Sequence, residues 1–225
     1  MKIGKARTNI RAEIDSQYEI LSQLIVDIAD HYQEDALCFE ESVYKMAEED
    51  CDGDIDIKHS ILSNFCEPLE KQYTLASEAR KILFCAIFSY FESMLYGLID
   101  YFKIPRGKTN QVGQLIDKIE EEYLKRYSEP LLFSCDKNVI SGFYRPLRNK
   151  FMHGHTGNPN DRKILFSYLE KDKRVSHLFG NYEINCNMFL RDVLIIITTF
   201  LVEIEEAYCK KERNSNWRNC CPSRN

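Results

Sequence analysis

The chain has few of the residues that interrupt regular structure, with nine glycines and six prolines among 225 residues. We therefore expect long helices or strands. The longest apolar run, residues 193–202, contains two threonines and is shorter than a membrane-spanning helix requires. No apolar segment follows the basic residues near the N-terminus, so we expect neither a secretory signal nor a membrane anchor, and a cytoplasmic location.

Several signatures of known chemistry are also absent. The nine cysteines are odd in number and lack C-x-x-C spacing, which favours reduced thiols over disulfides or a zinc site. The patterns G-x-S-x-G, H-E-x-x-H and G-x-G-x-x-G do not occur. Gly107-Lys108-Thr109 ends like a phosphate-binding loop without its earlier glycine, and the acidic stretch 48–54 lacks the calcium-loop pattern. We expect no metal and no cofactor.

Apolar residues recur mainly at helical spacing, which predicts an all-α fold with long N-terminal helices. One segment differs, because 175–186 alternates around Gly180-Asn181 and predicts a small β-hairpin insertion with those two residues as its turn. A short helix is expected to end before Pro68, since proline disrupts a helix interior. The expected helices are 7–36, 37–49, 57–70, 75–102, 110–127, 136–153, 162–170 and 188–209.

The same pass along the chain suggests three parts. Residues 1–70 are expected to form an N-terminal helical extension, with the acidic turn at 48–54 near its end. Residues 71–209 are expected to form the main helical domain. The tail, 210–225, is basic and without apolar periodicity, and we expect it to be disordered.

Charge is unevenly distributed. The net charge is −5, yet 136–165 holds six Lys or Arg residues against two Asp, a net charge of +4 that leaves −9 elsewhere. A local positive region on an acidic protein suits binding of phosphate groups. A solvated helix face is the plain alternative for the same charges.

The positive region contains the segment from Tyr144 to His155, where cations and two histidines gather. Its core, Arg148-Asn149-x-x-x-His153, resembles the signature motif of the HEPN superfamily, and Phe91-Glu92-Ser93 is similar to a segment that recurs in HEPN-like domains. This resemblance spans roughly residues 75–209. It implies a HEPN-like helical bundle and a metal-independent endoribonuclease that works as a homodimer with a composite active site. It also implies a role as a toxin or anti-phage effector, restrained by an antitoxin or another regulatory protein.

The motif residues suit RNA cleavage. A guanidinium such as that of Arg148 can bind phosphate through two hydrogen bonds. An imidazole such as that of His153, at a helix end set by Gly154, can transfer protons near neutrality. Asn149 lies one turn before His153 on the same face. Because cleavage needs two proton transfers, the second group is either His155 or His153 of a second copy, and we favour the second copy.

Five further residues are candidates for supporting roles. Glu92 lies in an apolar helix, where a buried carboxylate is costly unless it is paired, so it either orients Arg148 or a histidine or is simply a partly exposed or capped side chain. The other supporting candidates are neighbours in the segment: Tyr144, Arg145, Lys150 and His155. The competing hypothesis is a non-catalytic HEPN-like module for dimerisation or for binding a nucleotide or a partner protein.

Overall fold

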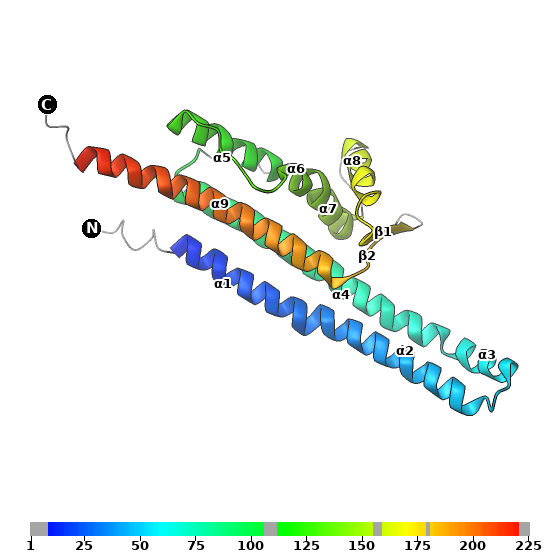
Figure 1. The fold of residues 1–225 in the computed structure, drawn as a ribbon. Helices are drawn as coiled ribbons and strands as arrows, with labels where there is room; N and C mark the ends of the chain where they lie inside the picture. The colour runs from blue at the N-terminus through cyan, green and yellow to red at the C-terminus, as the bar shows by residue number, and fades with distance from the viewer. Residues whose placement is uncertain (1–8, 106–111, 155–158, 179–180, 221–225) are drawn as a thin grey trace.

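The computed structural model describes residues 9–105, 112–154, 159–178 and 181–220, and it is mostly helical, which confirms the all-α prediction (Figure 1). The HEPN-like character of the bundle remains a prediction. In chain order the elements are α1 (Asn9–Leu24), the π-helical turn η1 (Ile25–Asp30), α2 (His31–Asp50), α3 (Ile55–Asn64), α4 (Cys66–Tyr101), α5 (Val112–Tyr127), α6 (Lys137–Val139), the π-helical turn η2 (Ile140–Tyr144), α7 (Arg145–His153), α8 (Pro159–Leu169), β1 (Val175–Leu178), β2 (Asn181–Ile184) and α9 (Asn187–Cys220).

Helices α4 and α9 form the centre of the fold. They run along each other between the α1–α2 rod and the α5–α7 layer (Figure 1). Phe84 and Phe91 of α4 are fully buried, with ring centroids 5.8 Å from Phe189 and 6.0 Å from Phe200 of α9. Burying each such side chain contributes about 1.5–3 kcal/mol. Among the described helices, α4 alone is long and apolar enough to suit a membrane span, and half of its apolar window is buried in the fold.

Residues 9–50 form one rod, so the predicted break between residues 36 and 37 is wrong. Buried residues are seven apart before η1, at Ile14 and Leu21, and again from Ala29 near the end of η1 to Ala36 and Val43. The step from Leu21 to Ala29 is eight residues. A π-helical turn accommodates one additional residue, so η1 keeps both halves of the rod packed on α4.

The predicted short helix that ends before Pro68 is confirmed as α3, which ends at Asn64, but the helix that follows begins earlier than predicted. Helix α4 begins at Cys66, which places Pro68 in its first turn, where backbone N–H groups have no partner within the helix and proline is tolerated. The shorter α3 begins after Asp54, whose carboxylate accepts hydrogen bonds from two backbone N–H groups. The expected domain boundary at residue 70 falls inside α4.

The motif helix forms as α6, η2 and α7 in unbroken succession. The N–H of Arg145 donates to the carbonyl of Ile140, five residues earlier, and α7 restarts with Pro146 in its first turn. Gly154 has φ +71° and its N–H donates to the Lys150 carbonyl at 2.9 Å, which confirms that it ends the helix in the left-handed conformation.

The hairpin is confirmed, with Val175 paired to Ile184 in an antiparallel register. Of the two residues predicted to form its turn, Asn181 instead pairs with Leu178 and belongs to β2, and Gly180 lies outside the described residues. Helix α9 continues to Cys220, so the prediction of disorder from residue 210 is wrong for residues 210–220, and 221–225 lie outside the described residues. An ion pair from Lys211 to Glu129 helps to hold this extension.

Candidate functional site

Arg148 of α7 reaches across to α4. Its Nη2 lies 3.3 Å from Oε2 of Glu92, and its Nη1 donates to Oδ1 of Asn149, also at 3.3 Å. The Arg148 and Glu92 side chains are 19% and 29% exposed. Of the two kinds of partner expected for Glu92, Arg148 or a histidine, the structure places Arg148 in contact with it. Two acceptors therefore set the orientation of the guanidinium, while its buried Nε has no hydrogen-bond partner in the described part of the chain.

Burial dominates the electrostatics of this contact. It raises the pKa of Glu92 above its usual value, and the positive charge of Arg148 only partly opposes that rise. Keeping Glu92 ionised at this half-buried position therefore costs free energy, even with Arg148 beside it. Such a cost at a half-buried ion pair is one feature of functional sites, although structural ion pairs show it as well.

Cys85 is a member of this site that the sequence did not single out. It lies seven residues before Glu92, which places both on one face of α4, and this spacing was the signal available in the sequence. Burial raises the pKa of the Cys85 thiol to about 11, and Arg148 acts in the opposite direction. The thiol is therefore protonated near neutral pH and is unsuited to act as a nucleophile.

The other end of α7 carries the histidine. His153 is the last residue of the helix and is exposed, one turn after Asn149. Lys150 donates from Nζ to the Gly154 carbonyl at 2.8 Å, and the same Nζ lies 5.8 Å from the centroid of the Tyr182 ring. Lys150 thus closes the helix end and contacts β2. The structure joins Arg148 directly to Asn149 and places His153 at the solvent-exposed end of the same helix.

The remaining predicted residues have different surroundings. Tyr144 is 3% exposed and packs edge-on against Phe84 and Phe189, with centroids 6.2 and 6.0 Å away, so it belongs to the aromatic core. Burial raises its pKa. Arg145 is half-buried and has interactions of its own, although its Nε lacks a hydrogen-bond partner among the described residues. His155 lies outside the described residues, as does Gly107-Lys108-Thr109.

Among the residues that the structure describes, no group of three or more His, Cys, Asp or Glu side chains is placed to hold a metal ion. In comparisons with known proteins, no family model, no curated protein and no solved structure matches this chain.

Proposed function

We propose that this protein is a metal-independent endoribonuclease of the HEPN type, with Arg148, Asn149 and His153 as its active-site residues. One observation carries the proposal. Glu92 of α4 and Asn149 of α7 hold the guanidinium of Arg148. Arg148 lies on α7, the short helix that ends in the exposed His153. Phosphodiester cleavage without a metal requires a cation that stabilises the phosphate and a group that transfers protons, and α7 carries residues of each kind.

The proposed reaction is attack of an RNA 2′-oxygen on the adjacent phosphorus. The bond from the 2′-oxygen to phosphorus forms, and the bond from phosphorus to the 5′-oxygen breaks. One imidazole accepts the 2′-hydroxyl proton and another group donates a proton to the departing 5′-oxygen, which yields a 2′,3′-cyclic phosphate and a 5′-hydroxyl. Arg148 would stabilise negative charge on the phosphate oxygens as the new bond forms.

The second proton-transfer group is proposed to come from a second copy of the chain. In a symmetric dimer the same residues of both copies meet across the axis, so two exposed His153 side chains can share one composite site. The proposed setting is the cytoplasm, with action as a toxin or anti-phage effector and restraint by an antitoxin or another regulatory protein. These roles rest on the family resemblance of the motif.

One observation favours a second candidate, a non-catalytic module for dimerisation or for binding a nucleotide or a partner protein. Both terminal nitrogens of Arg148 are already engaged within the chain, by Glu92 and by Asn149. In this alternative the ion pair fastens α7 to α4, and RNA is not cleaved.

The test is incubation of the purified protein with RNA in EDTA, comparing wild type with Arg148→Ala and His153→Ala. His59→Ala is the control, since His59 is an exposed histidine on α3. We expect fragments ending in 2′,3′-cyclic phosphate from wild type and the control, and at least about a 100-fold loss in both site variants. Cleavage that survives both site substitutions would overturn the proposed site. A folded, dimeric wild type that cleaves no RNA would favour the module.

A further inference from the structure

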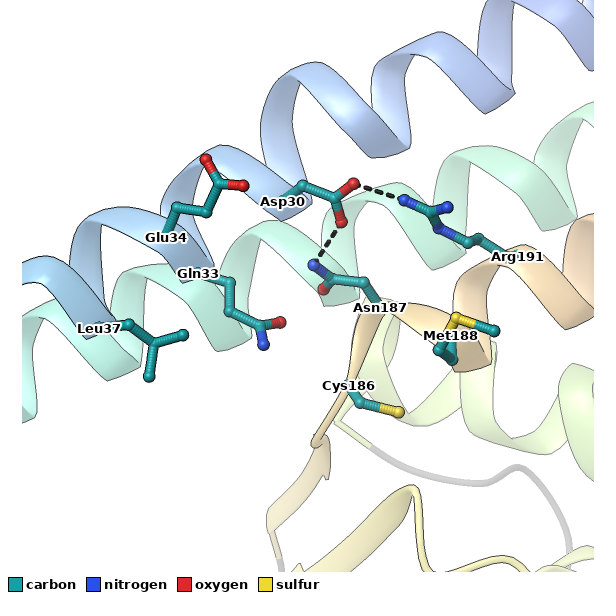
Figure 2. Close-up of a pocket in the computed structure, with 8 residues that line it drawn as sticks. All are labelled: Asp30, Gln33, Glu34, Leu37, Cys186, Asn187, Met188 and Arg191. Carbon is teal, nitrogen blue, oxygen red and sulfur yellow. Dashed lines mark hydrogen bonds and ion pairs between the residues drawn. The ribbon is translucent and has the colours of Figure 1, made fainter.

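A cavity of about 340 Å³ lies away from Arg148, where the rod formed by α1 and α2 meets the start of α9. Figure 2 shows its walls: one comes from the end of η1 and the first turns of α2, and the other from the residues that lead into and begin α9. The lining residues are Asp30, Gln33, Glu34, Leu37, Cys186, Asn187, Met188 and Arg191.

Asn187 is the central residue of this cavity. It is 7% exposed, and its Nδ2 donates to Oδ1 of Asp30 at 2.8 Å. Its Oδ1 is buried and has no donor in the described part of the chain. The amide cannot simply be reversed, because its oxygen would then face a carboxylate. A buried acceptor without a donor costs free energy, and a ligand that offers an N–H group would recover it.

The charges of the cavity favour a cation. Asp30 also pairs with Arg191, which balances its negative charge. Glu34 has no ion pair or hydrogen bond within the described residues and is exposed at the edge of the cavity, so its charge is not balanced. Leu37 and Met188, which are 44% and 57% exposed, provide apolar surface beside it.

The π-helical turn explains why these groups meet. Asp30 is the last residue of η1, directly after the buried Ala29, and the additional residue in that turn sets the direction in which Asp30 leaves the rod. π-Helical turns of this kind occur frequently at functional sites. The contact from Asp30 to Asn187 spans 157 residues of sequence.

We propose that this cavity binds an aliphatic ammonium group. One N–H would donate to Oδ1 of Asn187, the positive charge would lie near Glu34, and the alkyl chain would pack on Leu37 and Met188. The compact ammonium has three donors and no acceptor, which suits a small cavity lined by oxygens. A free diamine and the side chain of a lysine share this chemistry.

The test is calorimetric titration of the whole chain with 1,5-diaminopentane, with N-acetyl-lysine N-methylamide as the second ligand. The neutral analogue 1,5-pentanediol has nearly the same shape and no charge. We expect the amines to bind and the diol not to bind. In a sample labelled with ¹⁵N in asparagine, the Asn187 side-chain amide signal should shift on addition of either amine. The amine that binds more tightly identifies the source of the ammonium.

Substitutions at two residues of α2 test whether the amine binds in this cavity. Glu34→Gln should weaken amine binding about fivefold or more, the effect expected for loss of one nearby charge. Glu41→Gln is the matched control, because Glu41 is exposed, carries the same charge and lies two turns further along the same face, outside the cavity. Absence of amine binding, equal binding of the diol, or equal weakening by both variants would overturn the proposal.

Discussion

Nη2 of Arg148 and Oε2 of Glu92 lie 3.3 Å apart, and this contact joins α7 to α4 across 56 positions of sequence. The pair is only partly exposed, and burial raises the pKa of Glu92 despite the nearby guanidinium. Such a cost in the ionised form is a feature of functional sites and also of some structural ion pairs.

The first prediction concerns stability and pH for Glu92→Gln. The pKa of the folded Glu92 lies above the ordinary value of 4.5, so the folded protein holds this proton more tightly than the unfolded chain. The stability that Glu92 contributes is therefore present at low pH and falls as pH rises above 4.5 through the folded pKa. Glutamine cannot ionise, so the variant should gain stability relative to wild type as pH increases. Urea unfolding from about pH 4 to pH 7 measures this difference.

The control for that measurement is Glu70→Gln, an exposed carboxylate on α4. Its difference from wild type should change little over the same pH range, because exposed charges contribute little to stability. A Glu92→Gln variant that loses stability relative to wild type as pH rises would contradict the assigned direction.

The second prediction concerns Arg148→Lys. Lysine keeps the positive charge of Arg148, but its ammonium lacks the two planar terminal nitrogens that contact Glu92 and Asn149 together. The orientation of the cation is therefore lost. If the protein is a ribonuclease, we expect RNA cleavage to fall about 100-fold with the fold intact by circular dichroism. Arg162→Lys, at an exposed arginine on α8, should cleave RNA like wild type. Full activity in Arg148→Lys would show that the planar guanidinium is not needed.

The third prediction concerns the end of the motif helix. Gly154 has φ +71°, and a Cβ added there would meet nothing within 4 Å. Gly154→Ala should therefore lower the free energy of unfolding by about 1–2 kcal/mol through backbone strain alone. Gly154→Asn should lower it less, because asparagine tolerates the left-handed region. Equal stability of the alanine variant and wild type in urea unfolding would refute this account.

The fourth prediction compares two glycines. A Cβ at Gly142 in η2 would lie 3.0 Å from Cγ2 of Ile164 on α8, whereas one at Gly113 would lie 3.7 Å from Ser141, an ordinary contact. Gly142→Ala should destabilise the protein by about 1–3 kcal/mol through overpacking. Gly113→Ala should be neutral or stabilise it by up to about 1 kcal/mol, because alanine favours helix. The same effect from both substitutions, measured by thermal unfolding, would argue against a tight packing of α8 on η2.

The fifth prediction concerns thiol reactivity. Burial raises the pKa of Cys85 and of Cys135 to about 11, while Cys38 and Cys66 are exposed. Iodoacetamide near neutral pH should modify Cys38 and Cys66 well before Cys85, as measured by peptide mass spectrometry. Early labelling of Cys85 would mean that its thiol is more accessible, or more readily ionised, than the structure indicates.

Several features of the fold could be predicted because they depend on neighbouring residues. The end of α7 follows from Gly154, which alone among its neighbours adopts a left-handed conformation without strain. The hairpin follows from alternating side chains, although Asn181, predicted to lie in its turn, is paired with Leu178 in the sheet. The end of α3 before Pro68 was predicted, but the start of α4 at Cys66 was not, because proline disrupts a helix interior and is tolerated in a first turn.

By itself, the sequence determined the helical class, the hairpin and the motif helix that ends at Gly154, because periodicity and backbone preference act over a few residues. Only the tertiary structure decided which side chains meet. The pairing of Arg148 with Glu92, and of Asn187 with Asp30, depends on how helices distant in sequence are rotated against each other. That rotation depends on packing throughout the core and on the additional residue in η1, which no short window of sequence reveals.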